Sequence, residues 1–440
     1  MNSIQKAYYQ AFLFSLLVCL SPFKGLAYIT PFLSLAWIIL KKPDSQIFNN
    51  IFKWFCLSIF LIFIHAPFID NFAFGSSIIS IITYGSFAFI AIIPARLISS
   101  EILFERMLFW IKNIFLIEAF IGISQALYSY SMSGTFDLSN GDAVQGTIHI
   151  TPAYEPSFSN PMFTANMVFL MIAILPSFIL KNKAKIHCIV GSIAIILASV
   201  IHILIIFVFS FILSQLIYKF GLMRQKIFLT ISFLLLCVIS ISLLETNFAN
   251  LPNYIENMFK GEYPRSKMVI KVFHDIPKRY PLMPLIGFGP GQFSSRAGLI
   301  GTGMYLGGGE TARNLPLFPN EMSKPFEEEF LDMWLFTTLA QGQGYGSTHQ
   351  PHFSFLSVYT EFGAIFLFLI FLGVGVIILK IKKNTDLIKR FDRQIFSTSL
   401  TTGIFFVFFL GIQENYWEIT QAIFPGLMIL KILYANTTKT

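Results

Sequence analysis

Two histidines lie three residues apart in the stretch 348–363, THQPHFSFLSVYTEFG, and one of them has the setting of a general base. Pro351 disfavours helix at the residue before it, so the apolar run that follows is expected to begin a helix near His352. The N-terminal end of a helix disfavours a cationic imidazole, and a neutral imidazole is the form that accepts a proton. The sequence therefore predicts that His352, and not His349 in the preceding loop, is essential. The alternatives are an interfacial structural histidine and a metal site, but further ligands with suitable spacing are lacking and no metal is expected.

A second group with chemical potential is a basic, amphipathic stretch that spans residues 263–293. Apolar residues recur there at helical spacing, and cations flank or interrupt them. Such a segment can lie in a membrane interface with its basic side chains toward phosphate groups. Arginine binds phosphate more specifically than lysine because its planar guanidinium can donate two parallel hydrogen bonds. The candidate phosphate-binding residues are Arg265, Lys267, Lys271 and Arg279.

The same stretch ends in GFGPGQF, which holds Gly287, Gly289 and Gly291. It does not match a dinucleotide-binding fingerprint, because Pro290 interrupts it and no strand–helix unit surrounds it. We interpret the three glycines as a sharp turn beside the membrane or a ligand, since glycine adopts backbone conformations that other residues avoid.

Carboxylates at the ends of apolar runs, or inside them, are the third group. Glu155 precedes an expected helix, so a carboxylate is held at the mouth of that helix, although an ordinary polar helix start is the alternative. Glu361 shares a helix face with Ser354 and Ser357. Glu118 falls inside an apolar run, where an ionisable group costs about 2–3 kcal/mol to insert, so it has either a structural or a functional role.

Composition identifies the setting of these residues. Charged residues make up 12% of the 440 residues, 55% are hydrophobic, and 51 are phenylalanine. Together with repeated apolar runs of about 20 residues, this predicts an all-α, polytopic membrane protein. The net charge of +8 is then mostly a signal of topology, and no basic or zinc-finger pattern suggests nucleic acid. The four cysteines fall in apolar runs without CxxC spacing and indicate packing, with no disulfide framework.

About twelve transmembrane helices are expected from the apolar runs. They cover 8–21, 25–40, 52–68, 76–94, 107–128, 162–180, 187–201, 203–218, 227–244, 352–379, 396–411 and 416–434. Lysine and arginine in the short loops lie almost entirely on one side, which predicts that this side and both termini are cytoplasmic. The N-terminal run lacks a small-x-small cleavage site, so we interpret it as the first span and not as a signal peptide.

The expected organisation places two longer segments outside. Residues 1–244 would hold spans one to nine with a short periplasmic segment at 129–161, residues 245–351 a large periplasmic loop, and 352–440 the last three spans. The first part of the loop is basic, and the second part is acidic and glycine-rich, which is typical of an anion-binding surface beside a mobile cover. Simple solvation of loop charges is the alternative.

These stretches together resemble the O-antigen ligase/polymerase superfamily. LIGFGPGQF is similar to the family's glycine-rich turn, and PHFSFLSVYTEFG is similar to its Pro-His-Asn … Glu-x-Gly pattern, with Phe353 in place of the asparagine. EPSFSNPMFTAN resembles the family's entry to a span, and Arg265 stands ahead of the turn as is typical. The family's Ser-Arg-Ser-Gly pattern is missing; a stretch around His202 stands roughly in its place, which leaves one expected basic contact unassigned.

The resemblance implies a GT-C-like glycosyltransferase of the bacterial inner membrane that needs no cofactor. Its substrate would be an undecaprenyl-diphosphate-linked oligosaccharide at the periplasmic face, and a chain-length regulator protein is a further expected partner. Arg265, with Lys267, Lys271 or Arg279, would bind the diphosphate. His352 would take the proton from the hydroxyl group of the acceptor sugar, and Glu155 or Glu361 would orient the sugar or the histidine.

The expected activity is an O-antigen or surface-polysaccharide polymerase. The close alternative is the ligase, which moves the polymer to lipid A core or to protein. A transporter or lipid flippase is the alternative from another class; it would account for Glu118, but it leaves the loop of residues 245–351 unexplained and would be expected to show internal repeats.

Overall fold

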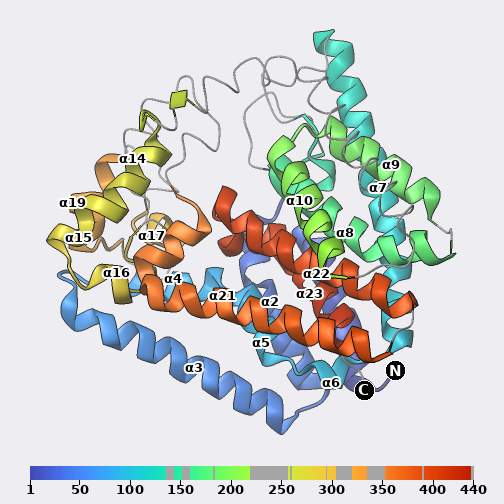
Figure 1. Cartoon of the computed structure of the whole chain (residues 1–440), viewed down its shortest axis with the longest axis horizontal. Helices are drawn as coiled ribbons and strands as arrows, with labels where there is room; N and C mark the ends of the chain where they lie inside the picture. Colours follow the sequence, from blue (N-terminus) through green and yellow to red (C-terminus); the bar gives the residue numbers. More distant parts are fainter. Residues whose placement is uncertain are drawn as a thin grey trace.

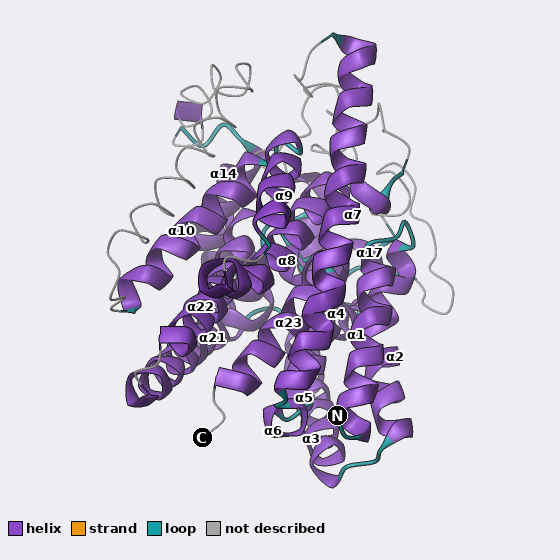
Figure 2. Ribbon diagram, turned by 90° about the vertical axis from the view of Figure 1, so that its right-hand side faces the viewer, coloured by secondary structure: helices purple, strands orange, loops and turns teal. Residues whose placement is uncertain are grey.

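A computed structural model describes residues 1–134, 143–150, 159–181, 184–218, 256–257, 260–293, 295–303, 320–333, 352–388 and 391–437. Within these residues the chain is entirely helical (Figures 1 and 2), as the sequence predicts. Glu155, His349 and the predicted ninth span, 227–244, lie outside the described residues.

The N-terminal helices begin and end where local signals place them. They are α1 (Ser3–Cys19), α2 (Lys24–Lys41), α3 (Ser45–His65), η1 (Ala66–Phe68), α4 (Phe74–Thr83), α5 (Gly85–Ile92), α6 (Ala95–Ile98) and α7 (Glu101–Ser133). Asn2 forms a capping box with Gln5, and Asp44 accepts from backbone N–H groups in the first turn of α3. Ser100 caps α7, and Gly134 ends it in a left-handed conformation.

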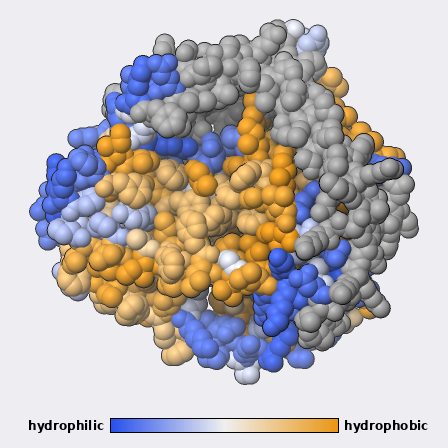
Figure 3. Space-filling model, viewed as in Figure 1, coloured by the Kyte–Doolittle hydropathy of each residue, from blue (hydrophilic) through white to orange (hydrophobic). Residues whose placement is uncertain are grey.

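The remaining long helices build the centre and the outside of the bundle. They are α8 (Ser159–Lys181), α9 (Lys185–Leu197), α10 (Ile201–Ile217), α21 (Ser354–Ile388), α22 (Phe391–Gln413) and α23 (Thr420–Thr437). In an apolar 18-residue stretch of α8, 83% of the residues are buried, against 11% in the corresponding stretches of α3 and α21. Helix α8 therefore lies in the core, and α3 and α21 present apolar side chains outward. Figure 3 shows a broad apolar area on the face of the molecule that is turned to the viewer in Figure 1, with hydrophilic residues at its edges.

Among the described residues, six helices are long and apolar enough to cross a membrane: α2, α3, α7, α8, α21 and α22. A seventh span results if α4 and α5, which bend by 56° at Tyr84, are counted as one. These helices are compatible with a polytopic membrane protein. A helix also occupies each of the other predicted ranges that the structure describes, but the total of twelve spans and the GT-C-like architecture stay predictions.

The described part of the large loop forms a small helical unit at one end of the molecule, on the left in Figure 1. It contains α14 (Pro264–Ile270), the π-helical turn η3 (Lys271–Asp275), α15 (Ile276–Arg279), α16 (Met283–Ile286), α17 (Arg296–Gly301) and α19 (Lys324–Glu329). Its core includes Met268, Val272, Phe293 and Phe326, and it also takes in Leu356 from α21. Shared burial attaches the loop firmly to the transmembrane bundle.

The glycine turn and α21 interlock at the backbone. Helix α21 is kinked at Gly363, which has φ 78° and ψ 175°, so the carbonyls of the preceding turn are released from helical bonding. The N–H groups of Phe288 and Gly289 donate to the carbonyls of Thr360 and Glu361, both at 2.8 Å. A Cβ at Gly363 would lie 2.1 Å from the Leu285 carbonyl oxygen. The predicted sharp turn is thus a site where two backbones pack without side chains between them.

Candidate active site

His352 lies two residues before α21 and is 7% exposed. The helix start beside it is clamped by residues 414–418, which we call the 414–418 turn. Ser354 donates from its hydroxyl to the Glu414 carbonyl at 3.0 Å and accepts from the Trp417 N–H at 3.1 Å. Ser357 donates to Oδ1 of Asn415 at 3.0 Å. The serine face of α21 therefore packs on the 414–418 turn and fixes where the His352 backbone lies.

A small cavity opens beside His352. Its lining combines one imidazole, one guanidinium, one carboxylate, one amide and one phenol with three apolar side chains: Pro161, Met162, Arg296, His352, Glu414, Asn415, Tyr416 and Ile419. The lining comes from α8, α17, the residues just before α21, and the 414–418 turn with the residue after it, so segments far apart in sequence meet here. His202, in the first turn of α10, places Nε2 3.2 Å from the Tyr416 hydroxyl and thus lies next to the cavity.

Arg265 lies at the start of α14 and reaches the same region. Its guanidinium carbon is 5.5 Å from the centroid of the Phe353 ring, the residue that follows His352. Burial lowers the pKa of Arg265 to about 10, although the Glu414 carboxylate acts in the opposite direction. The guanidinium stays charged at neutral pH and brings a second cation to the cavity.

Arg296 is the cation that the sequence did not single out. It opens α17, where the Ser295 side chain accepts from the Gly298 N–H at 3.0 Å and caps the helix. Arg296 is 8% exposed and lines the cavity together with His352. Its only sequence signal was membership of the basic half of the loop, because a lone arginine after a glycine turn has no distinctive spacing.

His352 is held neutral by its surroundings. Burial, together with the charges of Arg296 and Arg265, lowers the pKa of His352 to about 3. The sequence led us to expect a neutral imidazole because of the helix dipole, but desolvation and two arginines are the larger causes in the structure. The pKa of His352 is thus coupled to the charge state of the cavity.

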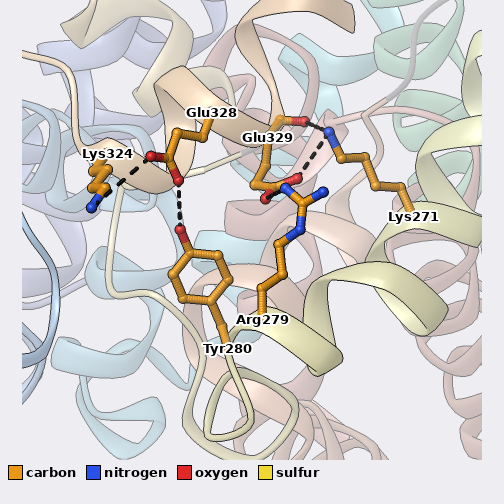
Figure 4. Close-up of polar contacts among 6 residues, drawn as sticks. All are labelled: Lys271, Arg279, Tyr280, Lys324, Glu328 and Glu329. Atoms are coloured by element: carbon orange, nitrogen blue, oxygen red, sulfur yellow. Dashed lines mark hydrogen bonds and ion pairs between the residues drawn. The ribbon is translucent and has the colours of Figure 1, made fainter.

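Three of the predicted phosphate ligands do not gather at this cavity. Lys271 lies 3.0 Å from one oxygen of Glu329, and Arg279 lies 2.5 Å from the other (Figure 4). The Glu329 side chain is 1% exposed, so both cations serve to neutralise a buried carboxylate. Lys267 is exposed on α14. Of the predicted set, only Arg265 approaches His352.

Glu361 also differs from its expected place. It lies in the third turn of α21, about 10 Å along the helix from Ser354 by helical rise. It is fully buried, and Oε2 accepts from the Gly291 N–H at 2.8 Å. The side chain thus contacts the glycine turn. The partners of Gly287 and Gly289 are likewise protein backbone or side chain, because added Cβ atoms would meet Glu361 and His65.

Glu118 has a structural partner in residues 143–150, part of the segment that the sequence predicts to lie outside. Its carboxylate accepts from the Thr147 N–H at 3.0 Å and from the Thr147 hydroxyl. Gln125, two turns along α7, binds the backbone of Gln145 and Gly146. Residues 143–150 therefore fold back onto α7, and the hydrogen-bonding alternative for Glu118 fits these contacts.

The 414–418 turn was missed because three of its five residues, 416–418, were assigned to a span. The expected twelfth helix began at 416, whereas α23 begins at Thr420 after the short helix η5 (Tyr416–Glu418). The signal was present in GIQENYWEITQ, a polar run that separates two apolar runs near the C-terminus. Two carboxylates in a short connection between apolar helices are costly to bury, so hydrogen-bonding or charged partners are expected for them in the folded protein.

Comparison of the chain with protein-family models, with curated proteins and with solved structures gives no match. The geometry around His352 is therefore the basis for assigning a function. Two arginines with planar donor groups lie beside a buried neutral imidazole. Such a set can bind a multiply charged phosphate group and accept a proton from a neighbouring hydroxyl.

Proposed function

We propose that the chain is a membrane glycosyltransferase that polymerises a surface polysaccharide from undecaprenyl-diphosphate-linked units at the periplasmic face of the bacterial inner membrane. The observation that carries the proposal is a cavity lined by Arg296 and His352, with Arg265 close enough to act electrostatically on the same histidine. This arrangement supplies anion binding and proton acceptance, the two functions that a lipid-diphosphate donor requires. The motif resemblance and the apolar helices support it further.

In the proposed reaction, the acceptor hydroxyl oxygen attacks the anomeric carbon of the donor glycan. The bond from this carbon to the diphosphate oxygen breaks, and lipid diphosphate leaves with the electron pair. His352 accepts the hydroxyl proton and later releases it to solvent. Arg265 and Arg296 stabilise the negative charge that develops on the leaving diphosphate, which is the larger share of catalysis in such transfers.

Donor binding would also activate the base. In the empty cavity the two arginines disfavour a proton on His352. A bound diphosphate places negative charge between them, and a nearby opposite charge raises a histidine pKa by about 1–3 units. His352 would thus become an effective proton acceptor only when the donor is in place, which limits wasteful proton uptake before binding.

The deciding experiment uses the purified protein in nanodiscs with the lipid-linked repeat unit as its sole substrate. A ladder of longer lipid-linked glycans is expected, and Arg265→Lys should impair it because an ammonium cannot make the bidentate contact. Lys267→Ala, which changes an exposed cation on the same helix, is the matched control. Absence of polymer, with transfer appearing only when lipid A core is added, would instead show a ligase.

A further inference from the structure

Two fully buried acidic side chains, Glu361 of α21 and Glu418 of η5, are not part of the cavity lining. They are close enough to interact electrostatically with each other. Burying two acidic groups together is unfavourable unless each is hydrogen-bonded, so their partners indicate what they do. Those partners include backbone N–H groups of one short segment of the large loop.

Each carboxylate holds one end of residues 291–297, which we call the arginine segment. Glu361 accepts from the Gly291 N–H at 2.8 Å, and Glu418 accepts from the Ala297 N–H at 3.1 Å. The Tyr84 hydroxyl donates to the other oxygen of Glu418 at 3.4 Å, which orients that carboxylate. Arg296 lies between the two held positions and interacts electrostatically with Glu418.

The start of the arginine segment is held a second time, by the side chain of Gln292. Gln292 accepts from the Ala73 N–H and donates to the Ala73 carbonyl, both at 2.9 Å. A Cβ at Gly301 would lie 2.1 Å from the Ser76 hydroxyl oxygen, so α17 packs directly on α4. With both ends bound to the helical bundle, the segment presents Arg296 to the cavity.

We propose that Glu361 and Glu418 are positioning residues that hold the arginine segment so that Arg296 faces the donor diphosphate. The inference rests on the proposed function, and it assigns Glu361 a role in placing an arginine, in contrast to the catalytic role expected from its sequence position. Carboxyl oxygens suit this task, because a buried backbone N–H that loses its acceptor is costly, so each bond favours the held position of the segment.

The test uses the purified full-length protein. It measures hydrogen exchange at the backbone amides of Gly291 and Ala297, and it measures diphosphate binding in the same sample. Glu361→Ala and Glu418→Ala should each speed exchange of the amides in the arginine segment by roughly 10- to 100-fold, as expected for loss of a buried hydrogen bond. Both should weaken binding of farnesyl diphosphate, a soluble polyprenyl diphosphate, by about tenfold or more. Glu327→Gln, an exposed carboxylate of α19, is the control and should change neither.

Three further variants separate the possible failures. Glu361→Gln and Glu418→Gln keep an acceptor oxygen and should speed exchange by only about three- to tenfold, which decides the matter if the alanine variants unfold throughout, as shown by exchange in α8. Arg296→Ala should lose diphosphate binding while the arginine segment stays protected. If Arg296→Ala binds like the wild type, the proposed diphosphate site fails. If Arg296→Ala loses binding but the carboxylate variants keep both binding and protection, the positioning role is overturned.

Discussion

At the scale of single residues, the chemistry depends on burial more than on sequence spacing. His352 lies where its backbone is clamped by Ser354 and the 414–418 turn, and its ring is desolvated between two arginines. Lys271 and Arg279 look equivalent to Arg265 in the sequence, but a buried Glu329 binds both of them. Which of the predicted residues remain candidates for catalysis is thus determined by the charged groups that are buried near each of them.

His352→Ala should abolish detectable polymer while the protein still inserts at normal abundance. Removing a general base typically costs about 10²- to 10⁴-fold in rate. His349→Ala is the matched control and should have a mild effect, because His349 precedes Pro351 in the loop sequence. Polymer ladders on gels, at equal amounts of protein in the membrane, compare the two. A normal ladder from His352→Ala would leave this histidine as an interfacial anchor.

The pH dependence of turnover should reveal the coupling between donor and base. With a pKa of about 3, free His352 is neutral throughout the assay range, so kcat/KM should show no acid limb from this residue above about pH 4. Diphosphate charge raises the pKa of His352 in the complex by about 1–3 units, so the acid limb of kcat should lie at higher pH than that of kcat/KM. Initial rates between pH 4 and 8 measure kcat and kcat/KM. If kcat does not fall toward pH 4 while kcat/KM stays constant, the coupling is ruled out.

At the scale of elements, the glycine turn is a packing joint between the loop and α21. The carbonyls freed by the kink at Gly363 accept from the turn, and His65 of α3 contacts the Ile286 carbonyl from the other side at 2.8 Å. The turn therefore connects two outward-facing helices to the loop that carries Arg265 and Arg296. Any change in the joint should affect the position of both arginines.

Gly363→Ala should destabilise this joint. A residue with a Cβ at φ 78° costs about 1–2 kcal/mol, and its contact with the Leu285 carbonyl adds about 1–3 kcal/mol of overpacking. The control is Gly373→Ala on the same helix, where the added methyl meets nothing within 4 Å. Thermal unfolding in detergent compares the variants. Equal midpoints for both would show that the kink tolerates a side chain.

The sequence predicted the elements better than it predicted their meeting points. Apolar runs located the helices because burial and helical period are local properties of the chain. The interlock of Gly287 with Gly363, and the approach of Arg296 to His352, join residues about 60 to 80 positions apart and have no local signature. The same holds for Glu418, whose partner Ala297 is known only once the chain has folded.

At the scale of the whole molecule, the bundle carries an apolar exterior and one polar end. Helices α3 and α21 expose large apolar side chains, among them Phe60, Phe63, Phe368 and Leu369. The described loop helices, with their ion pairs, gather at one end in Figure 1, while both termini lie toward the bottom of Figures 1 and 2. A chain that buried its apolar surface only internally would not have this distribution, so a membrane is the environment that fits it.

The last prediction concerns which side of that membrane the cavity faces. Lysine and arginine concentrate in the short loops opposite the large one, and residues 380–393 alone carry six of them. Such loops stay in the cytoplasm, whereas long loops translocate largely regardless of their charge. Reporter fusions at residue 300, in α17, and at residue 386, near the end of α21, should therefore give opposite sidedness, with residue 300 periplasmic. A fusion at residue 42, in another basic loop, should agree with residue 386. A cytoplasmic residue 300 would remove the lipid-linked donor from reach of Arg296 and His352, because the cavity would then open to the cytoplasm. Equal sidedness at 300 and 386, on either side of the membrane, would overturn the predicted topology.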